Sequence, residues 1–91
     1  MPIRKPLGYR QLTTIDAATT LSPPAGAQYA IIAADSAKGI NLRWRDDGTA
    51  PTTAVGMEIL AGNEEPYTGD LSAVQVIGVS TGAAANVAYY A

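Results

Sequence analysis

The stretch Ile40-Asn-Leu-Arg-Trp-Arg-Asp-Asp-Gly48 decides the predicted fold. Apolar Ile40, Leu42 and Trp44 alternate with polar residues, which is the period-2 pattern of a strand with one buried face and one solvated face. Asp47-Gly48 then supplies two residue types that tolerate positive φ, so the strand is expected to end in a turn. The only tryptophan of the chain is therefore predicted to lie at the centre of a small β core.

Residues 28–34 form a short continuous apolar run just before this stretch. A strand buried on both faces has this pattern, and a buried helix is the competing interpretation. The β-branched pair Ile31-Ile32 favours the strand. The polar segment 35–39 ends in glycine and suits a turn, so residues 28–45 are predicted to form the central hairpin.

Further short strands are predicted on both sides of this hairpin, each bounded by turn residues. They cover residues 8–15, 55–59, 67–68, 71–79 and 86–90. In the second of these, Val55, Met57 and Ile59 share one face, whereas residues 16–19 suit either one helical turn or an extended chain. Six or seven short strands with regular turns predict an all-β fold, a small antiparallel β-sandwich that is jelly-roll-like or barrel-like.

The chain length of 91 residues allows one domain. Residues 1–8 hold two prolines and a glycine and are predicted to be an extended N-terminal arm, with the sandwich domain over residues 9–91. A chain this short buries only about 60% of its unfolded surface, so we expect a homo-oligomer or docking on a larger partner. No apolar run approaches the ~20 residues that span a bilayer, so no membrane partner is expected.

The charge is small and unevenly distributed. A net charge of −2 with 15% charged residues argues against a nucleic-acid binder. Residues 1–10 carry three basic and no acidic groups, and the remainder carries three basic and eight acidic groups. A basic arm on an acidic body suits docking against an acidic neighbour, and a solvated flexible terminus is the alternative.

The residues of common active sites are missing. The chain has no cysteine and no histidine, which removes disulfides, thiolate ligands and the usual general base. Asp46-Asp47 and Glu64-Glu65 lack the spacing of an EF-hand loop, and adjacent acids in a turn are usually solvated. A serine nucleophile would need Lys5 or Lys38 as its base, and both are expected to be exposed. We therefore predict no enzyme activity, no metal and no cofactor.

Some polar and aromatic side chains suit contacts with a partner. Arg43 is expected to pair across strands with an acid such as Glu58, whereas for Arg45 a partner contact is equally open. Tyr89 and Tyr90 point to opposite faces of the last strand, so one of them is exposed. The candidate partner-binding residues are Arg4, Lys5, Arg10, Arg45 and Tyr90.

The chain resembles small structural proteins of tailed bacteriophages and prophages over about residues 28–90. The resemblance is carried, in order, by Leu42-Arg-Trp-Arg-Asp-Asp-Gly-Thr-Ala-Pro-Thr52, Val55-Gly-Met57, Tyr67-Thr-Gly-Asp-Leu-Ser-Ala73 and Asn86-Val-Ala-Tyr-Tyr90. It implies a virion component without catalytic residues, made in the cytoplasm of the host bacterium. The expected role is a capsid decoration (cement) protein that binds the major capsid protein on the capsid surface and stabilises the head.

Cement proteins of this kind commonly form trimers, so the resemblance implies a homotrimer in which linked weak contacts add up. On this hypothesis residues 1–10 reach a neighbouring capsid subunit. One alternative is a structural adaptor of a tail or head fibre. Another is a receptor- or carbohydrate-binding module, in which exposed tyrosines, Asn63 and the Asp46-Asp47 pair contact sugars.

Overall fold

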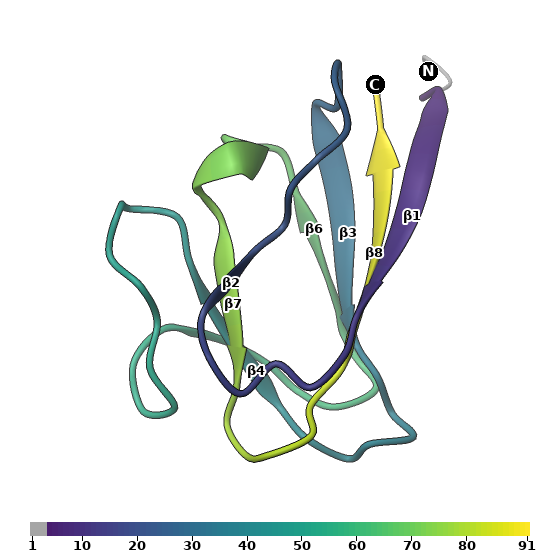
Figure 1. The fold of residues 1–91 in the computed structure, drawn as a ribbon. Helices are drawn as coiled ribbons and strands as arrows, with labels where there is room; N and C mark the ends of the chain where they lie inside the picture. The colour runs from purple at the N-terminus through teal and green to yellow at the C-terminus, as the bar shows by residue number, and fades with distance from the viewer. Residues whose placement is uncertain (1–3) are drawn as a thin grey trace.

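The computed structural model describes residues 4–91 and consists of two four-stranded antiparallel sheets that face each other (Figure 1). Sheet A has the strand order β1-β8-β3-β6, and sheet B has the order β2-β7-β4-β5. The elements are β1 (Pro6–Leu12), β2 (Thr19–Thr20), β3 (Tyr29–Ala34), β4 (Leu42–Arg45), β5 (Met57–Ile59), β6 (Glu64–Tyr67), the 3-10 turn η1 (Leu71–Ala73), β7 (Gln75–Gly78) and β8 (Ala85–Tyr90). The predicted small antiparallel β-sandwich is confirmed, with eight strands instead of six or seven.

The core lies between the two sheets and follows the period-2 alternation of their strands. In β3 the residues Ala30, Ile32 and Ala34 are buried, and each pairs with a buried residue of β8. Leu42 and Val76 are fully buried in sheet B. The alanines let the sheets approach closely, and the larger aliphatic side chains fill the space between them.

Trp44 is not the centre of this core. It is partly buried and packs against the edge of the core, whereas Leu42 two residues earlier is completely buried. The indole ring meets the ring of Tyr67 edge-on, with centroids 5.5 Å apart. The reason is that Trp44 pairs with Met57, the first residue of the edge strand β5. Met57 is 60% exposed, so it does not cover the indole ring.

The predicted central hairpin is wrong, because β3 and β4 belong to different sheets. The segment between them leaves sheet A as Asp35 donates its backbone N–H to the carbonyl of Ala84. It enters sheet B where the carbonyl of Asn41 accepts from Val79. The turn residues at 35–39 therefore connect two layers of the sandwich and do not pair neighbouring strands.

The prediction of an extended N-terminal arm over residues 1–8 is also corrected. Residues 6–8 belong to β1, which pairs with β8, and Lys5 exchanges backbone hydrogen bonds of 3.1 and 2.8 Å with Ala91. Pro6 is tolerated because β1 is an edge strand with a register shift between Pro6 and Gly8. The part of the predicted arm at residues 1–3 lies outside the described residues.

The strand predicted at 55–59 is shorter than expected. Only Met57–Ile59 forms β5, and of the three apolar side chains assigned to one face only Ile59 is buried. Thr52 and Val55 exchange backbone hydrogen bonds in a turn, and Gly56 has a φ of +142° that ends the extended chain. Val55 is consequently 51% exposed.

The remaining boundaries differ by a few residues. The predicted strand at 8–15 is β1, which begins at Pro6 and ends at Leu12. The ambiguous segment 16–19 contains no α-helix and leads into β2. The predicted strand at 71–79 divides into η1 and β7, because the Asp70 side chain accepts a hydrogen bond from the backbone of Ser72 and caps a single turn.

Candidate interaction face

The outward side of sheet A is mostly apolar and aromatic. Its strands alternate, so the neighbours of the buried residues point away from the core. We define the tyrosine face as six apolar and aromatic outward residues of β1, β3 and β8, namely Tyr9, Tyr29, Ile31, Ala33, Ala88 and Tyr90. All but Tyr9 are half-buried by their neighbours on the sheet, and Tyr9 is 66% exposed. The polar residues Gln11, Glu64 and Asn86 point to the same side of the sheet.

The outward side of sheet B has the opposite character. Its strands present Arg43, Arg45, Glu58 and Gln75 to solvent, and the pairs Arg43–Glu58 and Arg45–Gln75 stand opposite each other in the ladder. Antiparallel sheets usually carry polar side chains on the face that is not part of the core. Sheet B follows that rule except at Ile77 of β7, which shares the outward side with Arg43 and is buried. Sheet A departs from it, because apolar and aromatic side chains outnumber polar ones on its outward side. An outward face with this many apolar and aromatic side chains is a candidate interaction surface.

Strand β3 shows why the sequence concealed this face. Its continuous apolar run predicted burial on both sides, but only Ala30, Ile32 and Ala34 are buried, whereas Tyr29 and Ile31 are half-buried. A single chain of this size forms two layers, and sheet A has no third layer of residues 4–91 over its outer side. The second apolar side of β3 is therefore not covered by another layer of residues 4–91.

The aromatic rings on the tyrosine face are held in place. The rings of Tyr29 and Tyr90 lie with centroids 5.7 Å apart, tilted by 45°. The guanidinium carbon of Arg4 lies 4.3 Å from the ring centroid of Tyr29, a cation–π arrangement. The hydroxyl of Tyr9 donates a hydrogen bond to the side chain of Asn86. Ordered tyrosine and arginine side chains are the types enriched where proteins bind each other.

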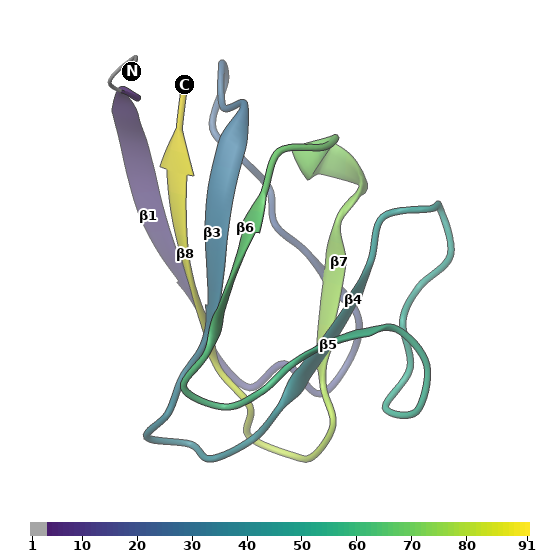
Figure 2. The same ribbon diagram turned by 180° about the vertical axis from the view of Figure 1, so that it is seen from behind.

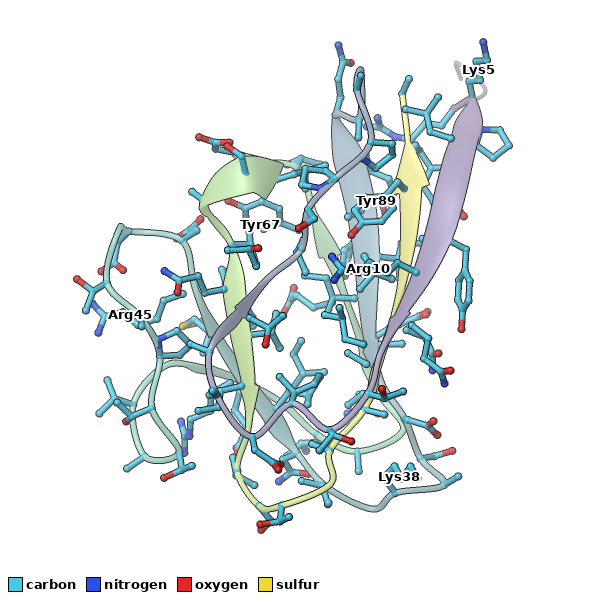
Figure 3. All side chains as sticks on the ribbon, in the orientation of Figure 1. Lys5, Arg10, Lys38, Arg45, Tyr67 and Tyr89 are labelled. Carbon is cyan, nitrogen blue, oxygen red and sulfur yellow. The ribbon has the colours of Figure 1, made fainter. Side chains whose placement is uncertain are left out.

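Three of the predicted partner-binding residues come together at one end of sheet A. Arg4 contacts Tyr29, which pairs with Tyr90, and Lys5 is paired through its backbone with the last residue of the chain. Figure 3 shows the side chain of Lys5 at this end of the sandwich, beyond the start of β1. The two basic residues thus border the tyrosine face.

Arg10 has a structural role instead. It lies on the inward side of β1 and its Nη1 donates a 2.8 Å hydrogen bond to the carbonyl of Leu21. The buried hydroxyl of Tyr89 donates to the same carbonyl at 2.6 Å. Figure 3 shows both side chains directed into the sandwich. Burial also raises the pKa of the Tyr89 phenol.

Arg45 lies far from the other predicted residues, on the outer side of sheet B (Figure 3). Its guanidinium donates two hydrogen bonds to the Asp47 carboxylate. These bonds raise the pKa of Arg45 and lower the pKa of Asp47. Arg43 pairs with Glu58 at 3.8 Å, as the sequence predicted, and also donates to the carbonyls of Thr53 and Gly56.

A second surface feature is a groove of about 520 Å³ beside the start of β5. We define the β5 groove by its lining residues Trp44, Arg45, Asp46, Val55 and Met57. The Trp44 Nε1 is buried and has no hydrogen-bond acceptor among residues 4–91. Asp46 at its rim accepts a 2.6 Å hydrogen bond from the hydroxyl of Tyr67.

The described residues contain no assembled metal site. Among residues 4–91, no three acidic side chains lie close enough together to hold a metal ion. The adjacent acids Asp46 and Asp47 are engaged by Tyr67 and Arg45, respectively. Over the same residues, no helix has the length and apolar character required to cross a membrane.

Comparisons of this chain with known protein families, with curated proteins and with solved structures found no match.

Proposed function

We propose that this protein is a non-enzymatic structural component of a tailed-bacteriophage virion, a cement protein that binds the major capsid protein lattice and stabilises the head. The resemblance of residues 28–90 to virion proteins motivates the role, and the tyrosine face is the observation that carries it. An outward sheet face with Ile31, Ala33 and Ala88 between tyrosines is suited to lasting contact with another protein surface.

The physical argument rests on area and repetition. Four strands spaced about 4.8 Å apart and about 20 Å long give a face of only a few hundred Å². A stable interface buries about 800 Å² on each partner, so one tyrosine face binds weakly by itself. Copies joined in a homotrimer, the state that the resemblance implies, would bind a repeating lattice through several such contacts at once.

The position of the N-terminal segment in sheet A changes the role that we propose for it. The backbone of Lys5 is hydrogen-bonded to Ala91, and β1 begins at Pro6, so residues 5–10 are not free to extend to a neighbouring subunit. We propose that Arg4 and Lys5 act as basic side chains at the border of the tyrosine face, where they contact an acidic patch of the capsid protein. A deletion of residues 2–8 would remove part of β1, so it would change the fold together with any contact of Arg4 and Lys5.

The test is the retention of variants on purified phage heads. Ile31→Lys places a charge in the middle of the tyrosine face, where the side chain is only half-buried, so the fold is retained. We expect this variant to bind heads that lack the wild-type protein at least about tenfold more weakly, since about 1.4 kcal/mol corresponds to that factor. Binding is measured by sedimentation with heads followed by quantitative gel densitometry.

The matched control is Gln75→Lys, which adds the same charge on the outer side of sheet B. It should bind like the wild type. Equal retention of the Ile31→Lys and Gln75→Lys variants would refute binding through the tyrosine face. Failure of the wild-type protein to bind heads at all would refute the cement role.

Copy number separates cement from the two other roles. A cement protein is present in many copies on each head, whereas a tail or fibre adaptor is present in a few, and densitometry of intact virions distinguishes them. The carbohydrate-binding alternative predicts binding of the isolated protein to a glycan array. Native mass spectrometry gives the oligomeric state, and a monomer or dimer would contradict the proposed homotrimer.

A further inference from the structure

We propose that β5, an edge strand of sheet B, pairs with an extended strand of a partner protein. In this added strand, apolar side chains alternate with basic ones. An apolar side chain of this strand occupies the β5 groove, and its basic side chains face the acidic surroundings of β5. The surface is separate from the tyrosine face and the inference does not depend on the cement role.

The first observation is that β5 is a sheet edge whose only protection is its short length. Among residues 4–91 it pairs only with β4, so no other described strand pairs with the backbone on its other side. Sheet edges are usually protected by proline, bulges, lysine, unpaired inward charges or very short strands. In this sandwich β1 has Pro6 and a bulge, β6 has Pro66 and two glutamates, and β2 has two residues.

Strand β5 has none of these protections except its modest length of three residues. Its one charged residue, Glu58, is paired with Arg43 on β4. A backbone edge in this state is a template for the addition of another strand.

The second observation is the concentration of exposed apolar side chains beside this edge. The exposed large apolar residues of the described chain are Tyr9, Val55, Met57 and Leu60, and three of these four lie within six residues around β5. Met57 is the most exposed of the three, at 60%. Together with the half-buried indole of Trp44, Val55 and Met57 line the groove, which is large enough for an aliphatic or aromatic side chain.

The third observation is charge, which specifies the chemistry of the added strand. Residues 46–91 contain six acidic residues and no basic residue. Strands β5 and β6, the corresponding edges of the two sheets, lie on the same side of the sandwich, as Figure 2 shows. Glu64 and Glu65 of β6 form no ion pair with any of residues 4–91. Basic side chains on the added strand would complement this side.

The two arginines of the neighbouring strand β4 pair with Glu58 and Asp47, and they leave Asp46, Glu64 and Glu65 without an ion pair among residues 4–91. Arg43 is engaged by Glu58 and by two backbone carbonyls, and Arg45 is engaged by Asp47. Within the described part of the chain, the side chain of Asp46, on the groove rim, is bound only by the neutral hydroxyl of Tyr67. A three-residue strand supplies few backbone hydrogen bonds, so the groove and the charge provide most of the specificity.

The test uses the full-length protein and two capped synthetic peptides, one of alternating valine and lysine and one of alternating valine and glutamate. Binding is followed by the fluorescence of the single tryptophan, Trp44, and by NMR shifts of the backbone amides. We expect saturable binding of the lysine peptide, with the largest shifts at residues 57–59. The glutamate peptide should bind at least about tenfold more weakly.

Two variants place the binding at β5. Met57→Arg fills the groove entrance and adds a cation at an exposed position, so it should weaken binding of the lysine peptide about tenfold or more while the fold is retained. Tyr9→Arg makes the same kind of change at an equally exposed position on the tyrosine face and should leave peptide binding unchanged.

Each of these measurements either supports or overturns strand addition at β5. Shifts confined to β1 or β6, equal affinity for both peptides, or no effect of Met57→Arg would overturn it. The two proposals also fail separately, because tyrosine-face variants impair binding to phage heads only and Met57→Arg impairs strand addition only.

Discussion

The hydroxyl of Tyr67 in sheet A donates a 2.6 Å hydrogen bond to the carboxylate of Asp46 at the end of β4 in sheet B. The bond therefore connects the two sheets of the sandwich directly. The Tyr67 ring is 8% exposed and meets the indole of Trp44 edge-on. One tyrosine thus joins the sheets by a polar contact and an aromatic contact beside the β5 groove.

Tyr67→Phe removes this hydrogen bond and keeps the ring. Hydrogen bonds to charged groups contribute about 1.5–3 kcal/mol, so the free energy of unfolding should fall by about that amount. The control is Tyr9→Phe, which loses an exposed hydrogen bond to Asn86 and should cost less than about 0.5 kcal/mol. Chemical denaturation measures the free energy of unfolding of both variants. A decrease for Tyr67→Phe as small as that expected for Tyr9→Phe would show that the Tyr67–Asp46 bond does not stabilise the fold.

The same tyrosine makes stability depend on alkaline pH. Burial and the nearby Asp46 carboxylate raise the pKa of Tyr67 to about 12, whereas a tyrosine in the unfolded chain ionises near 10. The unfolded state therefore loses the phenol proton first, and this contribution is complete below pH 10 and is lost as the pH rises through 12. Tyr89, whose pKa burial also raises, acts in the same direction.

Denaturation at a series of pH values checks this dependence. Tyr67→Phe should flatten the decline between about pH 10 and 12 without abolishing it, because Tyr89 still contributes. A wild-type stability that is constant over this range would contradict the raised pKa.

Leu42, and not Trp44, lies fully within the core, so truncating it should be costly. We expect Leu42→Ala to lower the free energy of unfolding by about 2–5 kcal/mol through lost burial and the cavity it leaves. Val55→Ala, a truncation at a position that the sequence placed on the same face as Ile59, should change it by no more than about 0.5 kcal/mol. A large loss for Val55→Ala would mean that residues 55–59 pack as the longer strand that the sequence predicted.

Arg43 is expected to hold the turn before β5. Its guanidinium donates to the carbonyls of Thr53 and Gly56, so Arg43→Met should loosen this turn while keeping most of the side-chain stem. Loss of about 1 kcal/mol of local stability corresponds to about fivefold faster amide exchange at Thr52 and Val55. Arg45→Met is the control, since Arg45 binds only Asp47, and it should leave these amides unchanged.

Local alternation predicted several side-chain positions correctly. Leu42 points into the core and Arg43 points outward to pair with Glu58, as the pattern of residues 40–45 indicated. Tyr89 and Tyr90 point to opposite faces of the last strand, as predicted, but Tyr90 is half-buried and not exposed. These predictions succeeded because the side-chain direction in a strand is set by the backbone of that strand alone.

The sequence predicted the candidate interaction face only in part. Tyr90 was predicted to contact a partner, but Tyr29 and Ile31 were assigned to a strand buried on both faces. Arg10 was also predicted to contact a partner, although it bonds the carbonyl of Leu21. An apolar run has the same pattern whether its second face is covered by the same chain or by a partner. Nothing in a single sequence distinguishes the two cases.

The sequence by itself determined that this chain forms short strands with turns between them, and which side chains of each strand share a face. Only the tertiary structure decided that β3 and β4 belong to different sheets, that β8 lies between β1 and β3, and that one apolar face stays open. The physical reason is the separation along the chain of the residues that decide each feature. The direction of a side chain follows from the backbone of its own strand, whereas the neighbours of a strand are chosen by contacts between residues far apart in the chain, such as Pro6 with Tyr90.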